Sequence, residues 1–142
     1  MPLIVAVADA VVAELNYATF SQTFQAERWY APRRALGELT SLAVSVVPAG
    51  LTVQAGSRAQ SQEEVSIDVA VQQKLTQESL AHLDPLLALT EEIAAHFRGK
   101  RLTPFPEAVW VKTEFPAIYA PEHLDQFRVF TSVIRLTFRI LQ

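Results

Sequence analysis

The stretch FRVFTSVIRLTFRIL, residues 127–141, carries the clearest strand pattern in the sequence. From residue 130 onward apolar side chains occupy every second position except Ser132, namely Phe130, Ile134, Leu136, Phe138 and Ile140. Successive side chains of a strand point to opposite faces of a sheet. The pattern therefore predicts one long strand with an apolar core face and a second face that carries Arg135 and Arg139. Because it closes the sequence, we expect this strand at a sheet edge, where another subunit could pair with it.

Two helices are expected to cover the apolar face of such a sheet. Residues 3–18 have apolar side chains at helical spacing, with charged side chains on the other side. Residues 85–98 form the second helix. Asp84 is its expected N-cap, Pro85 fits its first position, and Gly99 is placed to end it in the left-handed conformation.

The remaining strands are expected at residues 19–30, 42–47, 64–74 and 108–114, with residues 51–54 extending the second past a kink. Residues 64–74 alternate between apolar and polar side chains, which is typical of an antiparallel strand with one solvated face. They are expected to form a hairpin with residues 42–47. The intervening segment GSRAQSQEE, residues 56–64, is the least hydrophobic in the chain and predicts a flexible hairpin loop.

The order of these elements predicts one α+β domain over residues 1–142. Its sheet should be mainly antiparallel, with about four to five strands and the two main helices packed on one face.

Composition excludes several classes of site. The 142 residues contain no cysteine, so disulfides and thiolate metal sites are excluded. The net charge of −3 gives no general attraction to nucleic acid. The short apolar run near the N-terminus contains Asp9 and Glu14, so we expect neither a signal peptide nor a membrane helix.

Each histidine lies near a carboxylate in the sequence: His82 near Asp84, His96 near Glu92, and His123 near Glu122 and Asp125. Each pair supplies too few ligands for a closed zinc site, and no nucleophile accompanies them. We interpret Asp84 as a helix cap and the pair of His96 and Glu92 as an exposed helix pair. No phosphate-binding glycine motif is present. We therefore expect no catalytic, cofactor or metal site, and no enzymatic activity.

Charged side chains of the hairpin and the last strand form the candidate interface: Arg58, Glu63, Glu64, Asp68, Arg135 and Arg139. Arginine is favoured at interfaces because its planar guanidinium pairs with carboxylates and stacks on aromatic rings. The carboxylates could pair with the arginines within one chain or between copies, and a solvated sheet face explains the same pattern. A nucleic-acid site is less well supported, because the arginines are few.

The order of elements resembles that of the tail-terminator, or tail-completion, neck proteins of long-tailed bacteriophages. The resemblance rests on RRAL before a strand that ends VSVVPAG, on SRAQSQEEVSIDVAVQQKL, on the helix LDPLLALTEEIAAHF and on VFTSVIRLTFRIL. It implies a structural subunit of the virion neck, assembled in the host cytoplasm as a homo-oligomer, usually a hexameric ring. Such a ring caps the tail tube protein, joins the head-completion or connector protein, and lets DNA pass without sequence-specific binding; no membrane is involved.

Three other functions fit the same sequence. The first is another neck subunit, such as a head-completion, stopper or adaptor protein. The second is a tail-derived secretion component. The third is a small ligand-binding or enzymatic domain that uses one of the histidines.

Overall fold

The computed structural model describes residues 2–30, 42–55, 61–74, 83–117 and 129–141. Along the chain the elements are α1 (Leu3–Tyr17), β1 (Ala26–Arg28), β2 (Ala43–Ala55), β3 (Ser61–Lys74), α2 (Leu83–Phe97), β4 (Arg101–Leu102), β5 (Phe105–Ala117) and β6 (Val129–Leu141). Several residues singled out in the sequence lie outside the described residues: Arg58, His82, His123 and residues 56–60 of the predicted hairpin loop.

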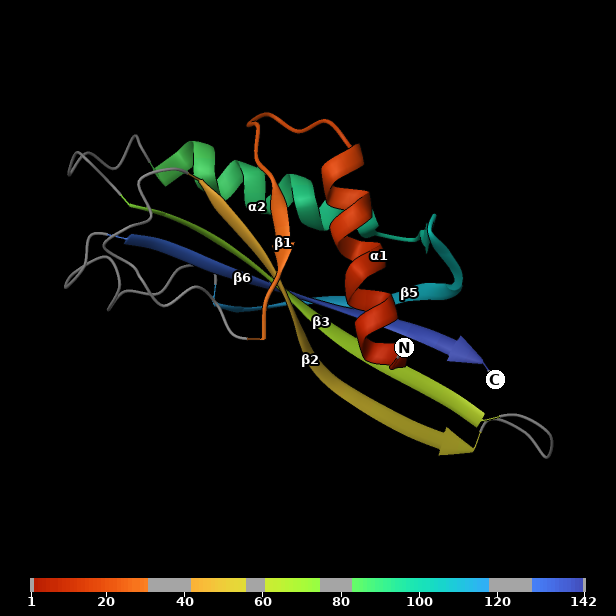
Figure 1. Ribbon diagram of the computed structural model, residues 1–142. Helices are drawn as coiled ribbons and strands as arrows, with labels where there is room; N and C mark the ends of the chain where they lie inside the picture. Colours follow the sequence, from red (N-terminus) through yellow and green to blue (C-terminus); the bar gives the residue numbers. More distant parts are fainter. Residues whose placement is uncertain (1, 31–41, 56–60, 75–82, 118–128, 142) are drawn as a thin grey trace.

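The described strands form one six-stranded sheet in the order β1-β2-β3-β6-β5-β4. β6 runs through its middle, antiparallel to β3 on one side and to β5 on the other (Figure 1). The expectation that the last strand lies at an edge is therefore wrong. β1 is parallel to β2, so the sheet is mixed, and two short strands enlarge it beyond the expected number. The predicted strand at residues 19–30 is reduced to Ala26–Arg28.

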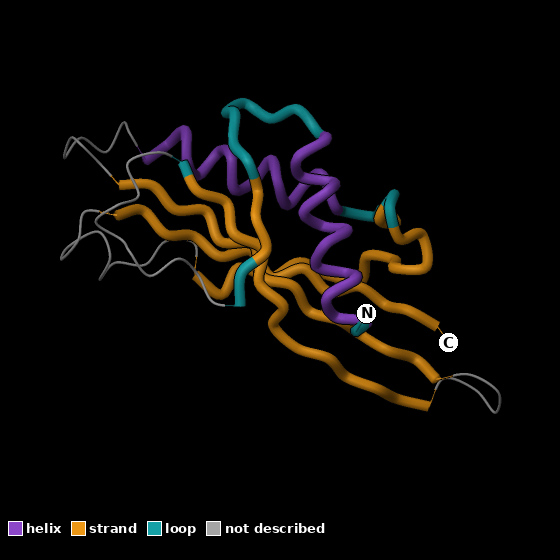
Figure 2. The backbone as a smooth tube through the Cα atoms, in the orientation of Figure 1, coloured by secondary structure: helices purple, strands orange, loops and turns teal. Residues whose placement is uncertain are grey.

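Both helices lie on the same side of this sheet (Figure 2). They cover the face that the alternation in β6 predicts to be apolar, and Phe130, Ile134, Leu136, Phe138 and Ile140 are at most 1% exposed. Val65, Ile67, Val69 and Val71 of β3 share this face and the same cluster. The apolar phase of the two central strands thus forms the floor of the core beneath α1 and α2. We call this side of the sheet the helix side and the opposite side the outer face.

β2 and β3 form the predicted antiparallel hairpin, but the strands run further than expected. Residues 61–64, assigned to the flexible loop from their polarity, are the first residues of β3, opposite residues 52–55. The register of β2 shifts between Pro48 and Gly50. Before this bulge Val44 and Val46 face the helix side; after it Leu51 and Val53 do, because an extra residue reverses the alternation.

The ends of α2 are set by local chemistry. The helix begins at Leu83, so Asp84 lies in its first turn and not at the cap position predicted for it. A carboxylate there still interacts favourably with the positive end of the helix dipole. Gly99 has a φ of 71°, the left-handed conformation predicted for it. The turn is closed by the Lys100 N–H, which donates to the Phe97 carbonyl at 3.2 Å.

The short strand β1 is held by the side-chain amide of Asn16, which makes the two hydrogen bonds that a neighbouring strand would make. The Asn16 Nδ2 of α1 donates to the Ala26 carbonyl at 3.1 Å, and the Ala26 N–H donates to Asn16 Oδ1 at 2.7 Å. The amide therefore satisfies both backbone groups at the outer edge of β1. Arg28 adds an ion pair to Asp9 of α1 at 2.7 Å. Together these contacts position β1 against α1.

Candidate assembly surface

The outer face of the sheet carries two cross-strand ion pairs between β3 and β6. Asp68 lies directly opposite Arg135, and Glu64 lies opposite Arg139. The Arg135 Nε donates to Asp68 Oδ1 at 2.8 Å and its Nη2 donates to Oδ2 at 3.0 Å, a bidentate arrangement. The Arg139 Nη2 donates to Glu64 Oε1 at 3.1 Å. Of the two arrangements that the sequence left open, the structure therefore contains the pairing within one chain.

The bidentate pair is the more enclosed of the two. The Asp68 side chain is 20% exposed and the Arg135 side chain 40%. The hydrogen bonds that Arg135 donates to Asp68, together with the negative charge of Asp68, raise the pKa of Arg135 above its usual value, and Glu114 of β5 adds a smaller attraction. Glu114 lies opposite Arg135 on its other flank. Arg135 thus has a carboxylate on each of its two neighbouring strands and is not a free cation.

The six predicted interface residues do not form one surface. The structure brings Glu64, Asp68, Arg135 and Arg139 together on the outer face, whereas Arg58 lies outside the described residues. Glu63 is on the helix side, opposite Val53 of β2 and Ile140 of β6. Adjacent strand residues point to opposite faces, so Glu63 and Glu64 could not share one. One oxygen of Glu63, Oε2, is buried without a hydrogen-bond partner among the described residues.

His96 has a structural partner that the sequence did not predict. Its Nε2 lies 2.9 Å from Glu14 Oε2 of α1, and the Thr103 N–H donates to Glu14 Oε1 at 2.7 Å. Burial raises the pKa of Glu14, but the hydrogen bonds from Thr103 and His96 outweigh it, so this pKa is lowered overall. The predicted pair of His96 and Glu92 is therefore wrong. Glu92 instead accepts a hydrogen bond from the Ser21 N–H at 2.9 Å.

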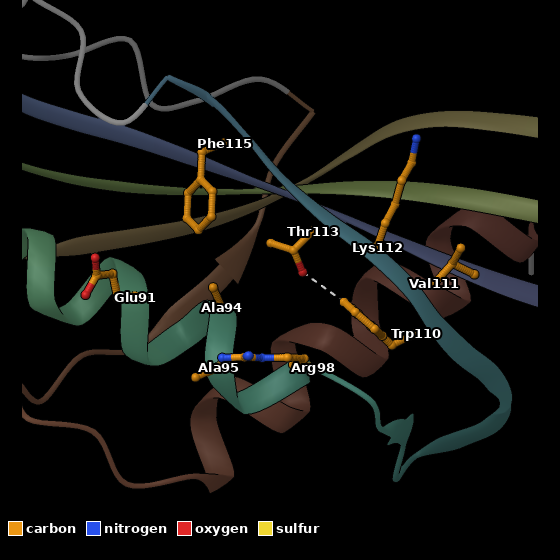
Figure 3. Close-up of a pocket in the computed structure, with 9 residues that line it drawn as sticks. All are labelled: Glu91, Ala94, Ala95, Arg98, Trp110, Val111, Lys112, Thr113 and Phe115. Atoms are coloured by element: carbon orange, nitrogen blue, oxygen red, sulfur yellow. Dashed lines mark hydrogen bonds between the residues drawn. The ribbon is translucent and has the colours of Figure 1, made fainter.

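A groove of about 680 Å³ separates α2 from β5 (Figure 3). Ala94 and Ala95 line its helix wall, and Trp110, Thr113 and Phe115 line its strand wall. The lining is completed by the charged side chains of Glu91 and Arg98 on the helix and by Val111 and Lys112 of the strand. The Trp110 Nε1 donates to Thr113 Oγ1 at 2.9 Å, which fixes the indole against its own strand. Phe115 is 42% exposed, so an aromatic ring at this groove remains accessible.

Sequence reasoning missed the groove and the exposed apolar residues of β2, Leu51 and Val53. The apolar residues of the strand wall, Trp110, Val111 and Phe115, can be seen in the sequence, but they do not keep a strict alternation that would assign them to one face. Which helix flanks that strand, and how closely, depends on contacts between distant residues.

Within residues 2–30, 42–55, 61–74, 83–117 and 129–141, no group of three or more His, Asp or Glu side chains is arranged to hold a metal ion. None of the helices found there has the length and apolar character needed to cross a membrane.

Comparison with known proteins gives one structural neighbour of interest. No protein-family profile matches the chain, and no curated protein matches it by sequence. The fold is similar to the sheath/tube terminator of an extracellular contractile injection system, PVC, seen by cryo-electron microscopy in its extended state. The TM-score is 0.51 and the sequence identity 11%. The match covers 100% of this chain but 57% of the terminator, so this chain spans little more than half the length of that protein.

Proposed function

We propose that this protein is a tail terminator, a structural subunit that caps the end of a tail tube. The observation that carries the proposal is the fold match over the whole chain to a sheath/tube terminator. It agrees with the resemblance of the element order to bacteriophage tail-terminator proteins.

The proposed role is structural and not catalytic. Several charged groups of the described residues hold elements of the fold together. Glu14 and His96 join α1 to α2, and Glu92 joins α2 to the segment before β1. The carboxylates of Glu64 and Asp68 are neutralised by arginines of the neighbouring strand. These contacts connect the two helices and the sheet into one unit, which supports a structural role.

In its full form, the proposal is that copies of this chain assemble into a ring. The resemblance to bacteriophage tail-terminator proteins implies six copies. The ring contacts the tail tube protein on one side and, in a virion, a head-completion or connector protein on the other, while DNA passes through its centre. A ring built from copies of one chain needs a head-to-tail interface between two different surfaces of each copy. The location is then the tail or neck of the particle, reached from the host cytoplasm.

A second candidate is the same capping role in a tail-derived injection particle that has no head. The specific observation that favours it is the neighbour itself, which belongs to an extracellular contractile injection system. The two candidates share the tube partner and differ only in whether a head-completion protein binds the opposite side.

Adding the purified protein to polymerising tail tube subunits tests the shared core of both candidates. We expect tube growth to stop and the protein to be found at one tube end by electron microscopy with a gold-labelled tag. Tubes that grow unchanged and carry no label at their ends would refute the capping role. A pull-down of the head-completion protein by capped tubes separates the virion from the injection particle.

A further inference from the structure

The distal half of β2 forms a sheet edge that no described strand covers. β3 pairs with one side of β2 as far as Ala55, whereas β1 pairs with the other side only from Val44 to Val46. Residues 51–55 are all exposed although they belong to the strand. Backbone groups along such an edge are a template for another strand. In the part of the chain that the structure describes, the hairpin thus presents one free edge.

This edge carries apolar side chains on the helix side. Leu51 is 49% exposed and Val53 is 58% exposed, and both point to that side because of the bulge between Pro48 and Gly50. The alternate residues, Thr52 and Gln54, are polar and face outward. Such an edge fits a partner strand that also has apolar side chains on one face and polar side chains on the other.

The opposite side of the sheet ends in a second free edge with this division. β4 covers β5 only near Phe105 and Val109, and the Trp110 N–H donates to the Lys100 carbonyl at 3.0 Å. Beyond Trp110 no described strand lies along the outer edge of β5. On the helix side this stretch presents Phe115 and the groove beside α2. On the outer face it presents Lys112 and Glu114, opposite Thr137 and Arg135.

The directions of the two edges fit each other in a head-to-tail arrangement. Three successive antiparallel pairings, β2 with β3, β3 with β6 and β6 with β5, leave β2 and β5 antiparallel. Rotation about a ring axis keeps the sense of the strands, so it brings β5 of one copy beside β2 of the next in antiparallel orientation, with the helix side of both copies on the same side of the joined sheet. Within one sheet the two uncovered stretches lie at different levels along the strands, because Leu51 is level with Trp110 and not with Phe115. Pairing them therefore needs a displacement along the strands, which a ring supplies when its strands are tilted against the ring axis, as in a closed barrel.

From these observations we infer that β2 of one copy pairs with β5 of the next copy. The pairing places the neighbour's Leu51 and Val53 in the groove between α2 and β5, against Phe115. This inference rests on the proposed function and assigns the subunit contact of the ring. The apolar side chains that are uncovered in one subunit become buried, and both free edges are satisfied. The outer-face ion pairs of β3 and β6 are then not the subunit contact.

Engineered disulfides test the contact directly, because the natural chain has no cysteine. The experiment uses four double variants that combine Leu51→Cys or Val53→Cys with Thr113→Cys or Phe115→Cys. They are oxidised in the full-length assembly, on tube ends if the ring forms only there. Four combinations are needed because the register between copies is not fixed. We expect at least one of them to give a ladder of covalent multimers on non-reducing gels, since a disulfide requires Cα atoms within about 7 Å.

Two controls define the arrangement. Each single variant should remain monomeric on the gel, because its thiol faces a different residue in the next copy. A dimer from Val53→Cys alone would indicate β2 paired with β2 and would overturn the inference. The combination of Thr52→Cys with Phe115→Cys places the thiols on opposite faces and should not cross-link.

The outcomes separate this inference from the proposed function. An assembled oligomer at tube ends in which none of the four combinations cross-links overturns the β2–β5 contact and leaves the capping role standing. Absence of any oligomer at tube ends overturns both. As a second measurement, Val53→Lys should abolish assembly while the melting temperature of the monomer stays unchanged, because this side chain is 58% exposed. Normal assembly of Val53→Lys would also overturn the contact.

Discussion

Truncation of Leu136 to alanine is predicted to destabilise the protein strongly. Leu136 is fully buried in the middle of β6, between Ile67 of β3 and Thr113 of β5. Buried leucine-to-alanine changes cost about 2.7–5.0 kcal/mol, depending on how far the site can collapse. Backbone pairing on both sides prevents β6 from moving into the void. We therefore expect a loss of about 4 kcal/mol in the free energy of unfolding, in the upper half of that range.

The expected change in melting temperature follows from the chain length. Unfolding entropy is about 2.1 cal/mol/K per residue, so a chain of 142 residues gains about 0.3 kcal/mol/K. A loss of 4 kcal/mol therefore corresponds to a drop of about 13 °C in the melting temperature. Calorimetry or circular dichroism on the isolated subunit measures it, and urea unfolding gives the free energy directly.

Leu141→Ala is the matched control, since it removes the same atoms from the same strand. Leu141 lies on the other phase and is 57% exposed. Its truncation should cost less than about 1 kcal/mol, or about 3 °C. Equal shifts for the two variants, or a shift below about 3 °C for Leu136→Ala, would refute the assignment of the core face of β6.

Three further predictions concern single contacts. Arg135→Glu should lower the free energy of unfolding by about 1–2 kcal/mol, because it places a like charge opposite Asp68 at a partly solvated site. Gly99→Ala should cost about 1–2 kcal/mol through backbone strain, because φ is 71° and no neighbouring atom lies within 4 Å of the added Cβ. Glu14→Gln should cost about 1–2 kcal/mol at neutral pH through weakened bonds to His96 and Thr103. The pKa of Glu14 is lower in the folded protein than in the unfolded chain. The stabilisation by its ionised carboxylate is therefore fully present above the unfolded pKa of about 4.3, and it is lost as the pH falls through the folded pKa.

Each of these has its own control in urea unfolding. The charge swap Asp68→Arg with Arg135→Asp should recover most of the stability, and failure to recover would show that the pair is not coupled. Gly50→Ala should be neutral or slightly stabilising, because no positive φ constrains it; a cost equal to that of Gly99→Ala would contradict the strain argument. The difference between the natural protein and Glu14→Gln should shrink on acidification, and a constant difference down to about pH 3 would contradict the role of the charge.

The periodicity of the sequence predicted which face of each long strand is buried, but not which strands are neighbours. The predicted apolar phase of β6, from Phe130 to Ile140, is buried, but the other phase is only partly solvated, because Val129, Thr131 and Thr137 are buried as well. Alternation says nothing of the strands on either flank, so the central position of β6 was missed. The two-residue strand β4 is too short to leave any periodic signal.

The candidate surfaces depend on register, which a single bulge can change. The shift between Pro48 and Gly50 moves Leu51 and Val53 to the helix side, where simple alternation from Val44 would have placed them on the outer face. The contact between His96 and Glu14 joins residues 82 positions apart, and no local pattern predicts it. The pairing of Asp68 with Arg135 was foreseen only as one of several possible pairs of opposite charge, within one chain or between copies.

The most direct test of the central claim is the length distribution of tails. Particles are purified from cells that lack the gene and from cells in which it is restored, and tail lengths are measured by negative-stain electron microscopy. If the protein terminates tails, the deletion gives tubes of variable and excessive length, and restoration returns a single length. Tails of one uniform length in both preparations would contradict the terminator role.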